Sequence, residues 1–172
     1  MRVIAFSCVH WMSRSLQVNV YEYEKPLDYV PFIRLCDIIV QTRPDAVVNL
    51  GDFTETYWED PPMLPDLYRW VQLGTVVHKL AGNHDRDNGA DHVVLDGVRY
   101  EHGHKLGVPG GDESVDGYIR GLRQNTSGLR VAHGHTHVPH NGVGGWPFDV
   151  GSVTFSRTYG EIIDGVPGLR LL

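Results

Sequence analysis

Cysteine is scarce in this chain of 172 residues, which contains only Cys8 and Cys36. Two cysteines do not make a disulfide framework, and Cys36 lies on the apolar side of a predicted helix, where we expect a small core residue. No apolar run approaches the length of a transmembrane helix, and residues 1–9 are too short for a signal peptide. We therefore expect a reduced, cytoplasmic protein that does not bind membranes.

Blocks of lysine and arginine are also missing, and the formal net charge is -6. A negative chain without a basic stretch argues against a general nucleic-acid-binding surface. There is no internal repeat, low-complexity segment or linker, so the sequence predicts a single domain over residues 1–172. Its oligomeric state is open, and a homo-oligomer is compatible with the sequence.

Apolar runs of strand length recur between glycine and proline residues. The runs cover residues 3–6, 45–50, 75–80, 97–101, 129–132, 148–155 and 168–172. Helical spacing of apolar residues predicts helices over 27–42, 65–73 and 113–123, the first with Asp28 as its cap and Pro31 in its first turn. Early alternation of helix and strand followed by strands predicts an α/β fold with two packed sheets and helices outside.

Histidines and acids follow the predicted strands, and four of the ten histidines fall in a few short motifs. The motifs are Ser7-Cys8-Val9-His10, Gly51-Asp52, Gly82-Asn83-His84-Asp85 and Gly134-His135-Thr136-His137. Because ligands bind at the carboxyl ends of strands in layered α/β folds, we expect these residues to meet there. In an extended stretch His135 and His137 would face the same way and could serve two metal ions, with Asp52 bridging them.

This order of motifs resembles the calcineurin-like metallophosphoesterase superfamily, especially its small bacterial and archaeal phosphodiesterases. The resemblance extends from residue 7 to about residue 155 and includes Glu101-His102-Gly103 as a further motif. It implies a four-layer α-β-β-α sandwich, made of two mixed sheets with flanking helices, and a dinuclear metal centre at the strand ends.

The resemblance also implies which residues hold the ions. One ion would be bound by Cys8, His10, His137 and the bridging Asp52, and the other by Asp52, Asn83, His102 and His135. His102 is chosen over His104 because the family ligand directly precedes the glycine, which leaves His104 behind the ligands or facing substrate. The catalytic residues would be His84, which assists the leaving group, and Asp85, which orients His84. The implied ions are Mn, Fe or Zn, divalent or trivalent, with Ni or Co as substitutes in vitro.

Cys8 departs from the family pattern, because the first motif is normally Asp-x-His. A Cys8 thiolate would remain an anionic ligand and would favour Zn or Fe over Mg and Ca. As a buried thiol it would coordinate poorly and leave one metal position weak. The sequence leaves both interpretations open. A second departure is Asp149-Val150-Gly151-Ser152, where relatives often carry Asn-Pro-Gly-Ser.

The reaction implied is hydrolysis of phosphodiesters, including 2′,3′-cyclic nucleotides, and of phosphomonoesters, by hydroxide generated at the two ions. We expect a small phosphoester substrate, a nucleotide foremost, contacted by Arg14, Trp11, Tyr57 or Trp58 near loops 18–23 and 53–64. One alternative is a weakly catalytic scaffold that binds a protein, motivated by the unusual residue at position 8. A nuclease is disfavoured by the negative charge.

Overall fold

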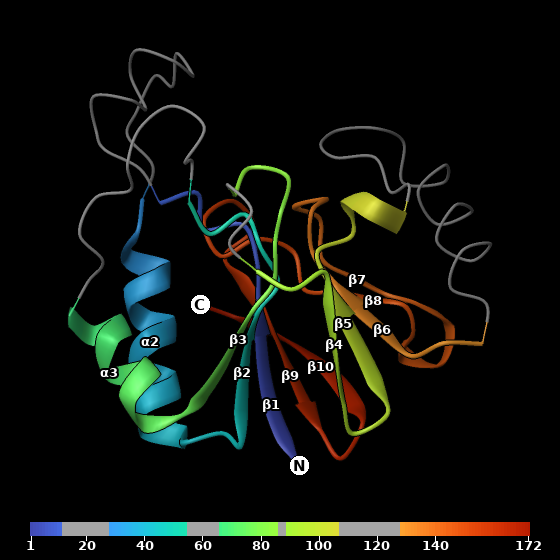
Figure 1. The fold of residues 1–172 in the computed structure, drawn as a ribbon, viewed down its shortest axis with the longest axis horizontal. Coiled ribbons are helices and arrows are strands. Elements are labelled where there is room, and N and C mark those ends of the chain that lie inside the picture. The colour runs from blue at the N-terminus through green and yellow to red at the C-terminus, as the bar shows by residue number, and fades with distance from the viewer. Residues whose placement is uncertain (12–27, 55–65, 86–88, 107–127) are drawn as a thin grey trace.

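The structure, a computed structural model, describes residues 1–11, 28–54, 66–85, 89–106 and 128–172. Two mixed sheets of five strands each pack against one another. Helices α2 (Val30–Thr42) and α3 (Asp66–Gly74) cover the outer face of the first sheet (Figure 1). The predicted helix 113–123 and the loop 18–23 lie outside the described residues, as does most of 53–64. No helix in the described ranges is long and apolar enough to cross a membrane.

The strands are arranged so that parallel neighbours end at one edge of the molecule. The first sheet has the order β10-β9-β1-β2-β3, with β1 (Arg2–Phe6), β2 (Ala46–Asn49), β3 (Val76–Lys79), β9 (Thr158–Ile163) and β10 (Val166–Leu171). The second has the order β4-β5-β6-β8-β7, with β4 (His92–Leu95), β5 (Val98–Glu101), β6 (Val131–His133), β7 (His140–Asn141) and β8 (Phe148–Asp149). Strands β1, β2 and β3 are parallel, as are β5, β6 and β8. Two short 3₁₀ helices, η1 (His104–Leu106) and η2 (Val143–Gly145), follow β5 and β7.

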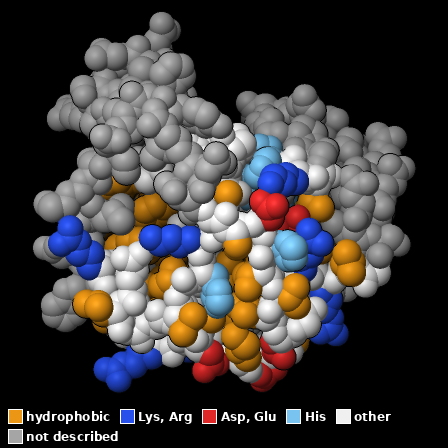
Figure 2. All heavy atoms as spheres, in the orientation of Figure 1, with side chains coloured by type: hydrophobic (Ala, Val, Ile, Leu, Met, Phe, Trp, Pro, Cys, Tyr) orange, Lys and Arg blue, Asp and Glu red, His pale blue; other side chains and the backbone are white. Residues whose placement is uncertain are grey.

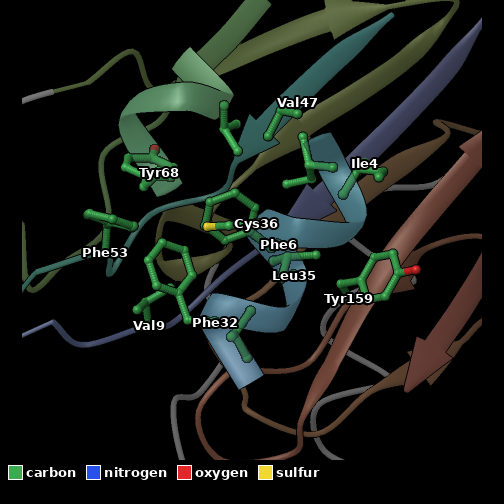
Figure 3. Packing of buried hydrophobic residues seen from close by; sticks show 13 residues of the cluster. Ile4, Phe6, Val9, Phe32, Leu35, Cys36, Val47, Phe53, Tyr68 and Tyr159 are labelled. Carbon is green, nitrogen blue, oxygen red and sulfur yellow. The ribbon is translucent and has the colours of Figure 1, made fainter. Parts of the chain in front are cut away.

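Strand β1 is apolar from Val3 to Phe6 because both of its faces are buried there. Ile4 and Phe6 point to a helix-side cluster, where they pack with residues of α2 (Figure 3). Val3 and Ala5 point the other way, into a second cluster between the two sheets. The alternation follows from the two-residue period of a strand, and a strand buried on both faces reads as a continuous apolar run. Cys36 is fully buried in the helix-side cluster, as the sequence predicted.

Most predicted elements lie where expected, within a few residues. Helix α2 begins at Val30, whose backbone N–H donates to the Asp28 carboxylate at 3.0 Å, and Pro31 stands in its first turn. The prediction of one strand over 148–155 was wrong, because β8 ends at Asp149 and residues 153–156 form a turn. Strands β4, β7 and β9 were missed. Gly160 and the acid Glu161 interrupt the apolar pattern of β9, although this strand lies beside β1 in the sheet.

Glu161 allows a prediction about stability. Its side chain is 7% exposed and accepts hydrogen bonds from Arg2 Nε at 2.8 Å and Arg170 Nε at 2.9 Å. Burial would raise the pKa of this carboxyl, but the hydrogen bonds and charges of the two arginines lower it below its usual value. Replacing Glu161 with glutamine should therefore reduce the free energy of unfolding at neutral pH by about 1–2 kcal/mol, measured with urea.

The same pair of proteins tests the pH dependence. A carboxyl whose pKa is lower in the folded than in the unfolded chain stabilises the fold above the unfolded-state pKa. That contribution is lost as the pH falls through the folded-state pKa. The difference between wild type and Glu161→Gln should be constant near neutrality and shrink as the pH falls below the ordinary glutamate pKa of about 4.3. A difference that grows on acidification would contradict this account.

Candidate metal centre

The predicted ligands follow strands of both sheets and meet at one edge. Cys8 and His10 follow β1, Asp52 follows β2, Asn83 follows β3, His102 follows β5, and His135 and His137 follow β6. Cys8, Asp52 and His102 are at most 1% exposed, and His10 is 5% exposed. The remaining three are partly buried. Residues separated by more than a hundred positions are thus brought together by the parallel strands, as the sequence predicted.

His102 is the centre of the first group of donors. Its Nδ1 lies 2.9 Å from the Leu50 carbonyl oxygen, so that nitrogen donates and fixes the ring orientation. Its Nε2 then faces Asp52 Oδ2 at 3.0 Å, Asn83 Oδ1 at 3.1 Å and His135 Nδ1 at 3.2 Å. Electron pairs converge on one point here. Such an arrangement binds a cation, either a proton on Nε2 or a metal ion.

A second group of donors lies around His10. Its Nε2 is 3.3 Å from Nε2 of His137, and the ligand atoms of Cys8, His10 and His137 all lie within 4.8 Å of one another. The ligand atoms of Cys8, Asp52 and His102 form another such set, also within 4.8 Å. The donors are therefore divided between two neighbouring positions rather than gathered in one.

The observed separations fit metal coordination. Two ligand atoms bound to one ion at bond lengths of about 2.0–2.3 Å lie roughly 2.8–3.6 Å apart. The nitrogen pairs at 3.3 Å and 3.2 Å, and the oxygen–nitrogen pairs at 3.0 Å and 3.1 Å, fall in this range. The mixture of imidazole, carboxylate and amide with one thiol suits Zn, Fe or Mn. The residues present therefore fit the metal centre that the sequence implies.

Burial controls the protonation of the ligands. It lowers the pKa of His135 and of His137 to about 4 each, with the charge of His102 adding to the effect at His135 and that of His10 at His137. Both imidazoles are neutral at physiological pH, with electron pairs available to an ion. Burial alone would raise the pKa of Asp52, but its hydrogen bond to His102 and the nearby imidazoles lower it well below its usual value.

Cys8 behaves differently. Burial, followed by the adjacent Asp52 carboxylate, raises the pKa of its thiol well above the usual value. Without a cation the thiol keeps its proton, and metal binding must release that proton. The sulfur therefore becomes an anionic ligand only together with an ion.

The backbone at the site is unusual, because five of the predicted ligands have positive φ angles. They are Cys8 at 56°, His10 at 51°, Asp52 at 51°, His135 at 76° and His137 at 62°. The prediction that His135 and His137 lie in an extended stretch was therefore wrong. They share the site because residues 135–138 form a bend in which His135 and His137 adopt left-handed backbone. A left-handed conformation costs an L-residue roughly 1–2 kcal/mol, and such strain concentrates at functional sites.

A pair of substitutions at His137 can measure this strain. His137→Ala and His137→Gly remove the same imidazole, but only glycine tolerates a φ of 62° without cost. In metal-free protein, we expect the glycine variant to be more stable than the alanine variant by about 1 kcal/mol in urea unfolding.

The control pair is Val94→Ala and Val94→Gly on strand β4, where the side chain is 59% exposed. There the order should reverse, because glycine weakens a regular strand. Equal stabilities of the two His137 variants would show that the backbone is not strained at this position.

Comparison with known protein families identifies the family of this chain. A family described as the calcineurin-like phosphoesterase superfamily domain matches residues 1–163. The chain belongs to the calcineurin-like phosphoesterase superfamily. The resemblance drawn from the motifs is thereby confirmed, as is the arrangement of two mixed sheets. No curated protein sequence matches this phosphoesterase domain significantly.

Solved structures of relatives share the fold of this phosphoesterase domain. Yfce, a phosphoesterase from E. coli, is 18% identical with a TM-score of 0.57, and the match covers 99% of this chain and 93% of that chain. A protein of unknown function from Aquifex aeolicus is 17% identical with a TM-score of 0.52, covering 98% of this chain and 95% of that chain. At these identities the likeness concerns the fold alone.

Two glycines of the phosphoesterase motifs allow the loops to approach closely. A Cβ atom on Gly82 would lie 2.1 Å from Asp52 Oδ1, and one on Gly134 would lie 2.1 Å from Ser7 Oγ. Both distances are far below van der Waals contact, so any side chain would push the loops apart. The Gly82 position brings the Asn83 loop against Asp52, and the Gly134 position brings the His135 loop against the Cys8 loop.

Ser152 and the turn over residues 153–156 support the first ligand loop. Ser152 Oγ donates to the Cys8 carbonyl oxygen and Thr154 Oγ1 to the Val9 carbonyl oxygen, both at 2.8 Å. These bonds hold the loop between Cys8 and His10. The only signal in the sequence was the segment 149–152, which the family pattern also marks, and its role depends on contacts between the two sheets.

The same turn carries Phe155, another residue that the sequence did not indicate. Its ring stacks on His137 with centroids 4.6 Å apart and an interplanar angle of 17°, and meets the edge of His10 at 5.6 Å. Phe155 is nevertheless 41% exposed. The phosphoesterase centre thus has an accessible aromatic side chain beside one pair of imidazoles.

A buried polar cluster supports the turn that carries His135 and His137. His133 and Asp149 are fully buried, and Thr136 Oγ1 donates to the Asp149 carboxylate. The other Asp149 oxygen accepts the Gly151 N–H at 2.7 Å. Asp149 therefore links the turn that carries His135 and His137 to the turn that carries Phe155.

The two predicted catalytic residues lie beside the ligands. His84 donates its backbone N–H to Asp52 Oδ1 at 2.9 Å, and its ring is 5.1 Å from that of His10. The Asp85 carboxylate accepts backbone N–H groups of Phe53 at 3.1 Å, Thr54 at 3.0 Å and Gly82 at 3.1 Å. Asp85 thus fastens the Asp52 loop to the His84 loop. Its predicted orientation of the His84 ring stays a prediction.

Trp11, one of the predicted substrate contacts, packs against aromatic residues of the helix-side cluster. Its ring packs against Tyr29 at 4.5 Å and Phe32 at 5.9 Å, on the helix side of the first sheet. Apolar burial there explains its position, and the prediction that it contacts substrate is not supported by these packing partners. Arg14, Tyr57 and Trp58 lie outside the described residues. Of the remaining histidines, His92 is exposed, and His78 and His140 are partly exposed on strands β3 and β7.

Proposed function

We propose that this phosphoesterase is a dinuclear, metal-dependent hydrolase of phosphodiester bonds in small nucleotides. 2′,3′-Cyclic nucleotides are the favoured substrates, and phosphomonoesters are secondary ones. The observation that carries the proposal is the convergence of imidazoles in two pairs, with nitrogen atoms 3.3 Å and 3.2 Å apart, around an anionic Asp52. A protein without metal chemistry has no need to hold so many electron-pair donors in strained backbone.

In this proposal one ion would be held by Cys8, His10, His137 and Asp52, and the other by Asp52, Asn83, His102 and His135. When bound, two such ions lower the pKa of water towards neutrality and neutralise charge that builds at phosphorus. Contacts within the protein fix the positions of these ligands. Leu50 orients His102, and the close packing at Gly82 sets Asn83 against Asp52.

A side chain of the protein, His84, supplies the proton in this proposal. His84 stands beside His10 and is tied through its backbone to Asp52, so its ring is placed at the edge of the centre. From there it donates a proton to the departing oxygen. Asp85 acts as a positioning residue by fastening the two loops. His104 lies 5.3 Å from His102, ring to ring, and burial lowers its pKa, so it offers a neutral N–H to a phosphoryl oxygen.

Charge favours a small substrate over a nucleic acid. The chain carries a net charge of -6. On the face shown in Figure 2, the lysine and arginine side chains of the described residues are scattered and form no continuous basic strip. A polymer of phosphates would need such a strip, whereas a single phosphoester needs only the ions and a few donors. The exposed ring of Phe155 offers an apolar surface to a base.

A substrate panel tests the proposal. The protein is purified without added metal, its metal content is measured, and Mn²⁺ or Zn²⁺ is then supplied. The substrates are bis-p-nitrophenyl phosphate, p-nitrophenyl phosphate, 2′,3′- and 3′,5′-cyclic AMP, and single-stranded DNA. We expect metal-dependent turnover of the diesters, with the 2′,3′-cyclic nucleotide fastest and no cleavage of DNA.

Two other results would change the assignment. Metal binding without turnover of any substrate would favour the weakly catalytic scaffold, for which the protonated Cys8 thiol of the metal-free protein is the motivating observation. Preferential cleavage of single-stranded DNA would identify a nuclease. Chelation with EDTA followed by re-addition of the metal is the control that ties any turnover to the ion.

A further inference from the structure

Phe155 differs from the other aromatic residues by its exposure. Among the phenylalanine, tyrosine and tryptophan side chains that the structure describes, it alone is exposed, at 41%. Its neighbours in the turn, Val153 and Thr154, are both buried. Single exposed apolar residues are common on protein surfaces, so the position of this ring decides what it can do.

One face of the Phe155 ring lies against the metal centre. It stacks on His137 with centroids 4.6 Å apart and an interplanar angle of 17°. The His10 ring is steeply inclined to both, with its centroid 5.6 Å from that of Phe155 and 5.3 Å from that of His137. Because these two distances are nearly equal, His10 stands beside the stack and not beyond Phe155. Neither imidazole therefore covers the second face of the Phe155 ring.

Hydrogen bonds hold the turn that carries this ring. The Phe155 N–H donates to Ser152 Oγ at 3.1 Å, and the Ser152 N–H donates to Ser156 Oγ at 2.7 Å. Ser152 Oγ in turn donates to the Cys8 carbonyl oxygen at 2.8 Å, which fastens the turn to the first ligand loop. A ring on an ordered turn loses little conformational freedom when a ligand contacts it, so less of the binding free energy is spent on ordering it.

The second face of Phe155 lies about as far from the ligands as a nucleotide base lies from its phosphate. A planar group packs on an aromatic ring at about 3.5 Å, so a base stacked on this face would lie roughly 8 Å from the His137 ring. One ribose unit spans such a gap when the phosphate is bound at the centre. A purine presents two fused rings to the phenylalanine and a pyrimidine presents one, so a purine has the larger stacking area.

We propose that Phe155 is a specificity-determining residue, which stacks against the base of the substrate and favours purine over pyrimidine nucleotides. The inference rests on the proposed function and deepens it by naming the base as a second recognised part of the substrate. His137, Phe155 and the base form three stacked layers. The ring contacts neither phosphorus nor the departing oxygen, so it lowers KM and leaves kcat unchanged.

Steady-state kinetics of the metal-loaded full-length protein test the inference. The substrates are 2′,3′-cyclic AMP, 2′,3′-cyclic CMP and glycerol 1,2-cyclic phosphate, which has the same cyclic diester and no base. We expect wild type to have its lowest KM for cyclic AMP. Phe155→Leu keeps an apolar side chain without the ring, and should raise this KM roughly 10–100-fold while the KM for the glycerol substrate stays unchanged. Phe155→Tyr keeps the ring and should behave as wild type.

Two controls separate stacking on a base from support of His137. Leu129→Ala removes another exposed apolar side chain, at the opposite end of β6 from His137, and should change no kinetic constant. The metal content of Phe155→Leu should equal that of wild type. Loss of metal, or an equal rise in KM for the glycerol substrate, would show that the ring only supports His137. Either result would overturn the inference and leave the phosphoesterase proposal standing.

Calorimetry with 3′-AMP tests stacking without turnover. Binding to the zinc-loaded Phe155→Leu variant should be weaker than to wild type by the same factor as the change in KM, whereas inorganic phosphate should bind both equally. Equal affinities for 3′-AMP, or no binding of it by wild type, would overturn the inference. Failure of wild type to hydrolyse any of the cyclic substrates would overturn the proposed function, and weaker binding of 3′-AMP by the variant would then still support the stacking role.

Discussion

Replacing Asp52 with asparagine is expected to abolish stable metal binding at the His102 group and to lower turnover by more than about 100-fold. Asparagine keeps the shape of the side chain and can still accept the His84 backbone N–H. It removes the only carboxylate of the predicted ligand set, the one that faces His102 Nε2 at 3.0 Å. Metal analysis after gel filtration and steady-state kinetics with bis-p-nitrophenyl phosphate measure the two effects.

Thermal unfolding adds a readout that does not depend on catalysis. An ion that binds only the folded protein stabilises it by about 2.7 kcal/mol at a hundredfold excess over its Kd. The unfolding temperature of wild type should therefore rise when metal is added, and that of Asp52→Asn should rise much less. Asp96→Asn is the matched control, because Asp96 is an exposed acid that also has a left-handed backbone, at φ 50°. Full metal content and activity in Asp52→Asn would remove Asp52 from the centre.

Replacing His84 with alanine should leave metal content unchanged and lower kcat by about 10²–10⁴-fold on a 2′,3′-cyclic nucleotide. The His84 contact to Asp52 uses the backbone N–H, which alanine retains. Only the imidazole, which lies 5.1 Å from the His10 ring, is lost. Kinetics and metal analysis on the same preparation separate a proton-transfer role from a metal-binding role.

The leaving group sharpens this test. An alkoxide needs a proton as it departs, whereas p-nitrophenolate is a stable anion and does not. His84→Ala should therefore lose far more activity on the cyclic nucleotide than on bis-p-nitrophenyl phosphate. His92→Ala, at an exposed histidine on strand β4, is the control for removal of an imidazole. Equal losses on both substrates would point to a role for His84 in binding or folding instead.

Positions of the main strands were predictable because burial leaves a direct trace in the sequence. The runs that became β1 and β2 are mostly apolar, since each lies between two cores. Strand β9 left no such trace. It lies between β1 and β10, yet it contains Gly160, whose Cβ would lie 2.7 Å from Phe148, and Glu161, which two arginines neutralise. Only the packing of the sheets explains why a glycine and an acid occupy a central strand.

Contacts of Asp85 and Phe155 at the site were likewise not predictable from the sequence. The acid next to His84 was expected to orient that ring, which stays a prediction, and the structure adds contacts with the backbone of Phe53, Thr54 and Gly82. Phe155 stacks on His137 although eighteen positions separate them in the chain. Neither contact has a local signal, because each depends on where separate loops end after the two sheets have packed.

The sequence by itself determined which kinds of donor atoms this protein offers and that they follow strand ends, because both depend on residue type and on local periodicity. It also indicated the family that the comparison confirmed. Only the tertiary structure decided how those donors are held. The left-handed backbone at Cys8, His10 and Asp52 lies where loops of the two sheets meet, and bonds such as that from Ser152 to the Cys8 carbonyl help to hold it. The place of Cys8 in both groups of donors is likewise a property of the folded chain, because it depends on distances between residues far apart in the sequence.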